Sequence, residues 1–150
     1  MLTDPQRIAF HTELLNDPKG LGYAVPYSIG NDDGLAALVN VVHDGGDFQV
    51  NNEPRTKAQI MAAVSTADWD AMTPENVQKF VAFISTLDTI PVADDSIFEK
   101  LVLPLPAEGD SRTTLAGLRK RQGTRGEVVS GINGFRLTGS DVAYAKSYTP

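Results

Sequence analysis

The sequence predicts an all-α fold, a compact bundle of short helices with Gly/Pro-rich loops that leaves room for a short hairpin or extended arm. Apolar residues recur three and four positions apart in several segments, which is the period of one helix face. Residues that favour helix starts precede most of these segments. The 13 glycines and nine prolines interrupt the pattern often, so the helices should be short. At 150 residues, we expect one domain over 1–150.

The first helix is predicted to begin after Thr3, because Gln6 stands where a capping box needs it and Pro5 suits the first turn. Residues 16–18, Asn-Asp-Pro, should end it. Its broad apolar face would consist of Ile8, Phe10, Leu14 and Leu15.

A turn with Gly20 and Gly22 should then deliver Tyr23 and the loop residues Pro26 and Tyr27. A second helix is predicted from Asn31 or Asp32. Its apolar face would be Leu35, Leu38, Val39 and Val42.

Residues 48–50 alternate and suggest a short extended piece. Thr56 and Gln59 form a second capping box, which opens a helix. The residues expected on its buried face are Ile60, Met61 and Val64. We expect Trp69 to lie in a short connection with its side chain in the core.

The clearest helix begins at residues 73–75, Thr-Pro-Glu, which supply a cap, a first-turn proline and an acidic group near the helix start. We predict this helix to be central. The core should centre on Val77, Phe80, Val81, Ile84 and Leu87.

After Pro91, a short helix opened by Asp94 or Asp95 is expected to bury Ile97, Phe98 and Leu101. Residues 103–106, Leu-Pro-Leu-Pro, cannot lie inside a helix.

Ser111 should open the next helix, with Leu115 and Leu118 inward and residues 119–121, Arg-Lys-Arg, at its C-terminal end. Thr124 with Glu127 makes a third capping box. Finally, residues 133–134, Asn-Gly, indicate a turn, and residues 135–137 an extended arm. Thr138 caps a last helix whose apolar residues include Val142 and Ala145.

Composition excludes several functions. The chain has no cysteine, so it has neither a disulfide nor a thiolate metal site. The net charge of −6 disfavours general binding to nucleic acid. No apolar run reaches the length of a membrane helix, and the N-terminal residues lack the pattern of a signal peptide. His43 beside Asp44 and Asp47 is interpreted as a polar turn, and we predict no bound metal.

No catalytic or cofactor motif stands out. The adjacent pairs Asp32-Asp33 and Asp94-Asp95 point apart on a helix and suit helix starts better than a reaction centre. Residues 20–22, Gly-Leu-Gly, are too short for a dinucleotide fingerprint, and no nucleophile elbow is present. We therefore expect no enzyme, no catalytic residue and no cofactor.

Two features are candidates for binding a partner. One is the basic cluster at 119–125, which is either a solvated helix end, a contact for an acidic protein surface, or a contact for DNA passing through a ring. The other is a pair of loop segments, 19–30 and 131–138, that carry aromatic and apolar side chains, a residue class enriched in interface cores. The predicted interface residues are Tyr23, Tyr27, Ile29, Arg119, Arg121, Arg125, Ile132 and Phe135.

Several short motifs follow one another in an order typical of one family. They are Asp17 to Tyr23, Leu38-Val39-Asn40, Trp69, Thr114-Leu115 with Leu118, Thr124-Arg125 with Glu127, and Leu137-Thr138 with Asp141-Val142-Ala143. In this order and spacing, the chain resembles small α-helical structural proteins encoded in the virion gene cluster of tailed, siphovirus-like bacteriophages. It departs from their pattern at residues 119–121 and between Val41 and Thr56.

The resemblance implies a virion structural protein made in the cytoplasm of the host bacterium, and no catalytic residue. For a domain of this size and acidity, we expect a head–tail connector subunit, an adaptor or head-completion protein, in a homo-oligomeric ring. Its partners would be the portal and neighbouring connector or tail-completion subunits, with packaged DNA nearby and no membrane. The alternative is a small acidic phage protein that inhibits or regulates a host enzyme by binding it.

Overall fold

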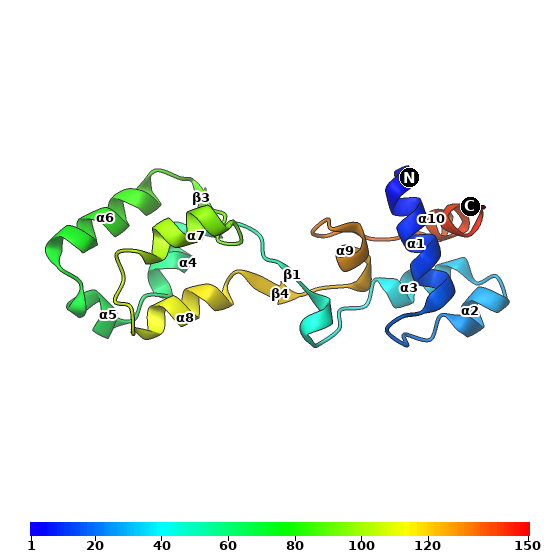
Figure 1. Cartoon of the computed structure of the whole chain (residues 1–150), viewed down its shortest axis with the longest axis horizontal. Coiled ribbons are helices and arrows are strands. Elements are labelled where there is room, and N and C mark those ends of the chain that lie inside the picture. The colour runs from blue at the N-terminus through cyan, green and yellow to red at the C-terminus, as the bar shows by residue number, and fades with distance from the viewer. The chain divides into compact units, whose positions relative to one another are not determined.

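The computed structural model describes residues 1–150 and is mainly helical (Figure 1). The α-helices are α1 (Asp4–Asn16), α2 (Ala24–Ser28), α3 (Asp32–Val39), α4 (Lys57–Ala62), α5 (Thr66–Ala71), α6 (Pro74–Ser85), α7 (Asp95–Val102), α8 (Asp110–Gly117), α9 (Arg125–Ser130) and α10 (Gly139–Lys146). All except α1 and α6 have eight residues or fewer, as the frequent glycines and prolines predict, whereas α1 has 13 residues and α6 has 12.

Two small sheets accompany the helices, so the fold is predominantly rather than strictly α-helical. β1 (Gln49–Asn51) follows the single-turn 3₁₀ helix η1 (Gly46–Phe48) and pairs with β4 (Lys120–Gln122). β2 (Arg55–Thr56) pairs antiparallel with β3 (Thr89–Ile90). The extended piece predicted at 48–50 is thus β1, shifted by one residue.

The chain divides into two compact units. Unit 1 comprises Met1–Val50 and Gln122–Pro150, and unit 2 comprises Asn51–Arg121. Unit 1 is therefore built from both ends of the chain, and unit 2 from one continuous stretch. That residues 1–150 act as a single domain stays a prediction.

In unit 1 the core brings α1 and α3 together with the C-terminal helix α10 (Figure 1). Phe10 and Leu14 of α1, Leu35 and Val39 of α3, and Val142 of α10 are almost completely buried. The prediction of one core around residues 77–87 did not include this second cluster.

Unit 2 has its own core, to which α6 contributes Phe80 and Ile84, both buried as predicted. Val77 and Leu87 pack against it in part. Val81 was wrongly assigned to this core, because it is 40% exposed. Trp69 packs edge-on against Phe80 at a ring-centroid distance of 5.5 Å, but it lies within α5 and not in a connection.

The helix starts follow the predicted caps closely. Thr56 and Gln59, and likewise Thr124 and Glu127, form reciprocal capping boxes. Thr3 with Gln6 and Thr138 with Asp141 do the same for α1 and α10. The hydroxyl of Thr73 accepts the Asn76 N–H at the start of α6.

Besides Val81, four further side chains expected in the core are exposed. Ile8 and Leu15 are 44% and 58% exposed, so the apolar face of α1 is narrower than predicted. Met61 is also exposed. Val42 lies beyond the end of α3, where it forms an isolated bridge with Thr124.

No helix is both long enough and apolar enough to span a membrane.

Two further predictions of local structure were wrong. Residues 24–28 form the helix α2 instead of a loop, with Pro26 inside its short span. The basic residues 119–121 do not end a helix, because α8 stops at Gly117 and the chain continues into β4. Residues 103–106 are outside any helix, as predicted.

Candidate interaction sites

The loop after α1 is organised by one carboxylate. Asp17 ends α1 in a left-handed conformation with a φ of 41°. Its side chain accepts the backbone N–H groups of Leu21, Gly22 and Tyr23 at 2.6, 2.8 and 3.1 Å. Gly22 has a φ of +87°, a backbone conformation that glycine adopts without steric cost. The Asp17–Tyr23 motif thus builds a rigid turn.

This turn directs Tyr23 inward. Tyr23 is completely buried, so it is not a projecting loop residue as its place among the interface residues assumed. Burial, reinforced by the negative charge of Glu13, raises the pKa of the Tyr23 hydroxyl. The ring therefore stays neutral and contributes to the core of unit 1.

Arg125, at the start of α9, forms a two-pronged ion pair with Glu13 of α1. Its Nε and Nη2 atoms each donate to one carboxylate oxygen at 2.7 Å. The side chains are only 12% and 4% exposed. The Glu13 carboxylate in turn raises the pKa of the Arg125 guanidinium. Arg125 consequently ties α9 to α1, and little of it faces outward.

The segment before α10 is held by two side chains. The Asn40 amide donates to the Leu137 carbonyl at 2.7 Å and accepts the Leu137 N–H at 2.9 Å. One carboxylate oxygen of Glu127 accepts the Thr124 N–H, and the other accepts the Gly134 N–H at 2.5 Å. Segment 131–138 is therefore held against the rest of unit 1 by Asn40 and Glu127.

Phe135 lies in this segment and stacks on Phe10, with ring centroids 5.4 Å apart and planes 17° from parallel. Like Tyr23, it packs on the core of unit 1. Tyr27 also packs there in part, and the Lys146 ammonium lies 4.8 Å from its ring centre.

The apolar side chains that do project from the two segments are Val25, Ile29 and Ile132. They are 69%, 71% and 49% exposed. Val25 and Ile29 are four residues apart and so lie on the same side of α2. Ile29 and Ile132 were predicted interface residues, and Val25 was missed.

In unit 2, Arg119 lies against the start of α7. Its guanidinium donates to the carbonyls of Val92 and Ala93 at 3.1 and 3.2 Å and pairs with the Asp95 carboxylate. It also lies 4.5 Å from the centre of the Phe98 ring. Arg119 therefore has a structural role, although a quarter of its side chain is exposed.

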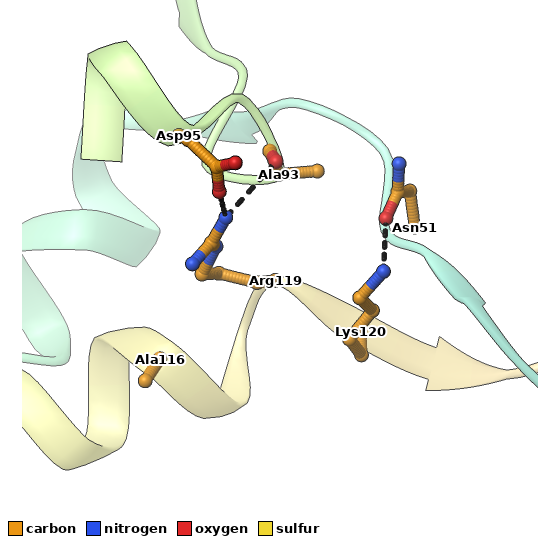
Figure 2. A pocket seen from close by; sticks show the side chains of 6 residues that line it. All are labelled: Asn51, Ala93, Asp95, Ala116, Arg119 and Lys120. Atoms are coloured by element: carbon orange, nitrogen blue, oxygen red, sulfur yellow. Dashed lines mark hydrogen bonds and ion pairs between the residues drawn. The ribbon is translucent and has the colours of Figure 1, made fainter. Parts of the chain in front are cut away.

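A recess of about 420 Å³ opens beside Arg119. We call it the Arg119 recess, and its lining residues are Asn51, Ala93, Asp95, Ala116, Arg119 and Lys120. Figure 2 shows the neighbouring side chains of Arg119 and Lys120 each ending on an acceptor from this chain, Asp95 for one and Asn51 for the other. Lys120 was part of the predicted basic cluster, whereas nothing in the sequence linked Asn51 or Asp95 to it.

No group of three or more His, Cys, Asp or Glu side chains is arranged to hold a metal ion. In the polar turn at residues 43–47, Asp47 pairs with Lys19 at 2.9 Å, and the His43 ring packs against Phe48. Arg121 has interactions within the chain.

Comparisons with known proteins returned no family model, no curated protein and no solved structure that matches this chain. The structure offers two surfaces on which a partner could bind. They are the projecting apolar side chains of unit 1 and the Arg119 recess of unit 2, which is lined by basic and other polar residues. The interface assignments of the eight residues stay predictions; Tyr23 is buried, whereas Val25 and Ile29 are exposed.

Proposed function

We propose that this chain is a structural protein of a tailed-phage virion, a head–tail connector subunit that acts in a ring through protein–protein contacts. The observation that carries the proposal is the ordered set of family motifs, together with the roles that their residues take in the fold. The side chains of Asp17, Asn40 and Glu127 form hydrogen bonds with backbone groups of this chain. Residues used in this way build a scaffold, which is what a structural subunit requires.

The projecting side chains of unit 1 supply the contacts in this proposal. Val25 and Ile29 stand on a segment fixed by Asp17, and Ile132 on a segment fixed by Asn40 and Glu127. Because these backbones are already ordered, a partner that covers the side chains loses little conformational entropy. A ring repeats one such contact between every pair of neighbouring subunits.

Mass spectrometry of purified phage particles tests the proposal. The protein should be present in mature virions and in isolated necks. Its absence from particles would refute the virion role and favour the alternative, binding to a host enzyme.

A double variant, Val25→Ser with Ile29→Ser, tests the contact surface. It should leave the monomer folded, because both side chains are exposed, and it should block the joining of heads to tails. Leu103→Ser is the matched control, since Leu103 is 77% exposed but lies in unit 2. Normal joining by the double variant would remove these two residues from the proposed contact.

A further inference from the structure

We propose that the Arg119 recess is a binding site for a carboxylate side chain of an acidic protein segment. The proposal deepens the connector function and rests on it for the identity of the partner, but the binding chemistry can be tested separately. Three features of the recess support this: hydrogen-bond donors that remain available, the space beside them, and an internal carboxylate that already occupies part of the site.

The donors come from two adjacent basic residues. The Arg119 Nε atom is committed to the Val92 carbonyl, and its Nη2 atom to Ala93 and Asp95. The guanidinium carries five N–H groups, so the two on Nη1 are left for another acceptor. The Lys120 ammonium donates one hydrogen bond to Asn51 and has further N–H groups that can bind another acceptor.

The recess has the space and the polarity that such a ligand needs. Its volume is about 420 Å³, and two of its lining residues, Ala93 and Ala116, are too small to fill it. Figure 2 shows the Arg119 side chain ending at Asp95 and Ala93, and the side chain of the adjacent Lys120 ending at Asn51. A carboxylate that enters beside them meets two positive charges and one negative charge.

Asp95 shows which chemistry the site accepts. Its carboxylate pairs with Arg119 although the side chain is 86% exposed, so it is held by little else. Because the Asp95 end of the pair lies largely in water, its contribution is weak and the carboxylate can exchange with another one. Asp95 therefore acts as an internal competitor that a stronger or multiply charged acidic segment displaces from Arg119.

A protein segment suits the site better than DNA. The chain carries a net charge of −6, and Asp95, which lines the recess, follows the acidic cap residue Asp94 at the start of α7. A long phosphate backbone would have to pass these groups, whereas one or two carboxylates on a flexible segment enter locally.

The test is a titration of the full-length ¹⁵N-labelled chain at low salt, followed by amide chemical shifts. The probes are an acetylated tetraglutamate peptide and, separately, a short DNA duplex. We expect the peptide to shift the amide signals of residues 93, 95, 116, 119 and 120.

Two variants assign the binding to the recess. Lys120→Gln should weaken the peptide roughly two- to fivefold, and Asp95→Asn should strengthen it by a similar factor, as expected for single exposed charge pairs. Lys100→Gln is the control, because it removes the same charge from α7 without touching the recess. Arg119 is left intact, since it holds residues 92 and 93 in place.

Three results would overturn the proposal: no shifts at the lining residues, equal weakening by Lys120→Gln and Lys100→Gln, or stronger shifts with the duplex than with the peptide. Failure of the titration leaves the virion proposal intact, because that proposal is decided by the protein content of particles. Conversely, a chain absent from virions that still binds the peptide retains the site but loses the connector as its setting.

Discussion

The ion pair between Glu13 and Arg125 allows the sharpest test of how unit 1 is held together. Removing one partner from a buried pair typically costs about 3–5 kcal/mol, because the other charge is left without compensation. Here both hydrogen bonds are 2.7 Å long, and Glu13 is 4% exposed. Arg125 keeps 12% exposure, so water relieves part of its isolated charge. We therefore expect Glu13→Gln to lower the free energy of unfolding by about 3 kcal/mol, at the lower end of that range.

The assay is urea unfolding of Glu13→Gln, Arg125→Met and the double variant, followed by far-ultraviolet circular dichroism. The double variant should lose clearly less stability than the sum of the single variants, because it leaves no unpaired charge behind. Glu75→Gln is the control, since its pair with Lys79 is largely exposed and should contribute little. If the two single losses add without interaction, or if Glu13→Gln is as stable as the control, the pair does not hold α9 to α1 as argued.

Further predictions concern both units. Phe80→Ala should cost about 3–5 kcal/mol because the ring is fully buried, whereas Val81→Ala should change little; equal effects in urea unfolding would contradict the core of unit 2. Asn40→Ala should cost about 2 kcal/mol by leaving both backbone groups of Leu137 without partners, and hydrogen exchange should rise at 137. Hydrogen bonds from Ser111 lower the pKa of Asp68 below the ordinary value of 3.8. The stability that Asp68 contributes should therefore be complete above about pH 4 and lost as the pH falls through the lower, folded-state pKa. In urea unfolding at several pH values, the free energies of unfolding of Asp68→Asn and of the natural chain should therefore become equal in acid. A difference between them that does not change with pH would contradict this. Thermal melts with and without a strong chelator should coincide, and destabilisation by the chelator would reveal a bound metal.

Local chemistry made the helix starts predictable. A threonine followed three residues later by Gln, Glu or Asp satisfies free backbone donors using only neighbours in sequence. The predicted caps at Thr3, Thr56, Thr124 and Thr138 are therefore present. The same holds for α6, whose start and apolar period lie within a dozen residues.

Long-range pairing could not be predicted in the same way. Arg125 and Glu13 are 112 residues apart, and Asn40 and Leu137 are 97 apart, so no sequence spacing marks either pair. The end of α8 was misplaced for the same reason, because residues 120–122 form a strand only through their pairing with β1. Tyr23 was assigned to a surface since glycines surround it, but Asp17 turns that loop inward.

The discontinuity of unit 1 has a consequence for synthesis on the ribosome. Its core needs Phe10 and Leu35 from the first 50 residues, and Val142 and Ala145 from the last ten. Because α1 and α3 emerge from the ribosome before α10, their apolar faces remain uncovered until α10 has been synthesised. Unit 2 is continuous and has all its residues available once Arg121 has emerged. The order of folding during translation should therefore be the middle of the chain first and its beginning last.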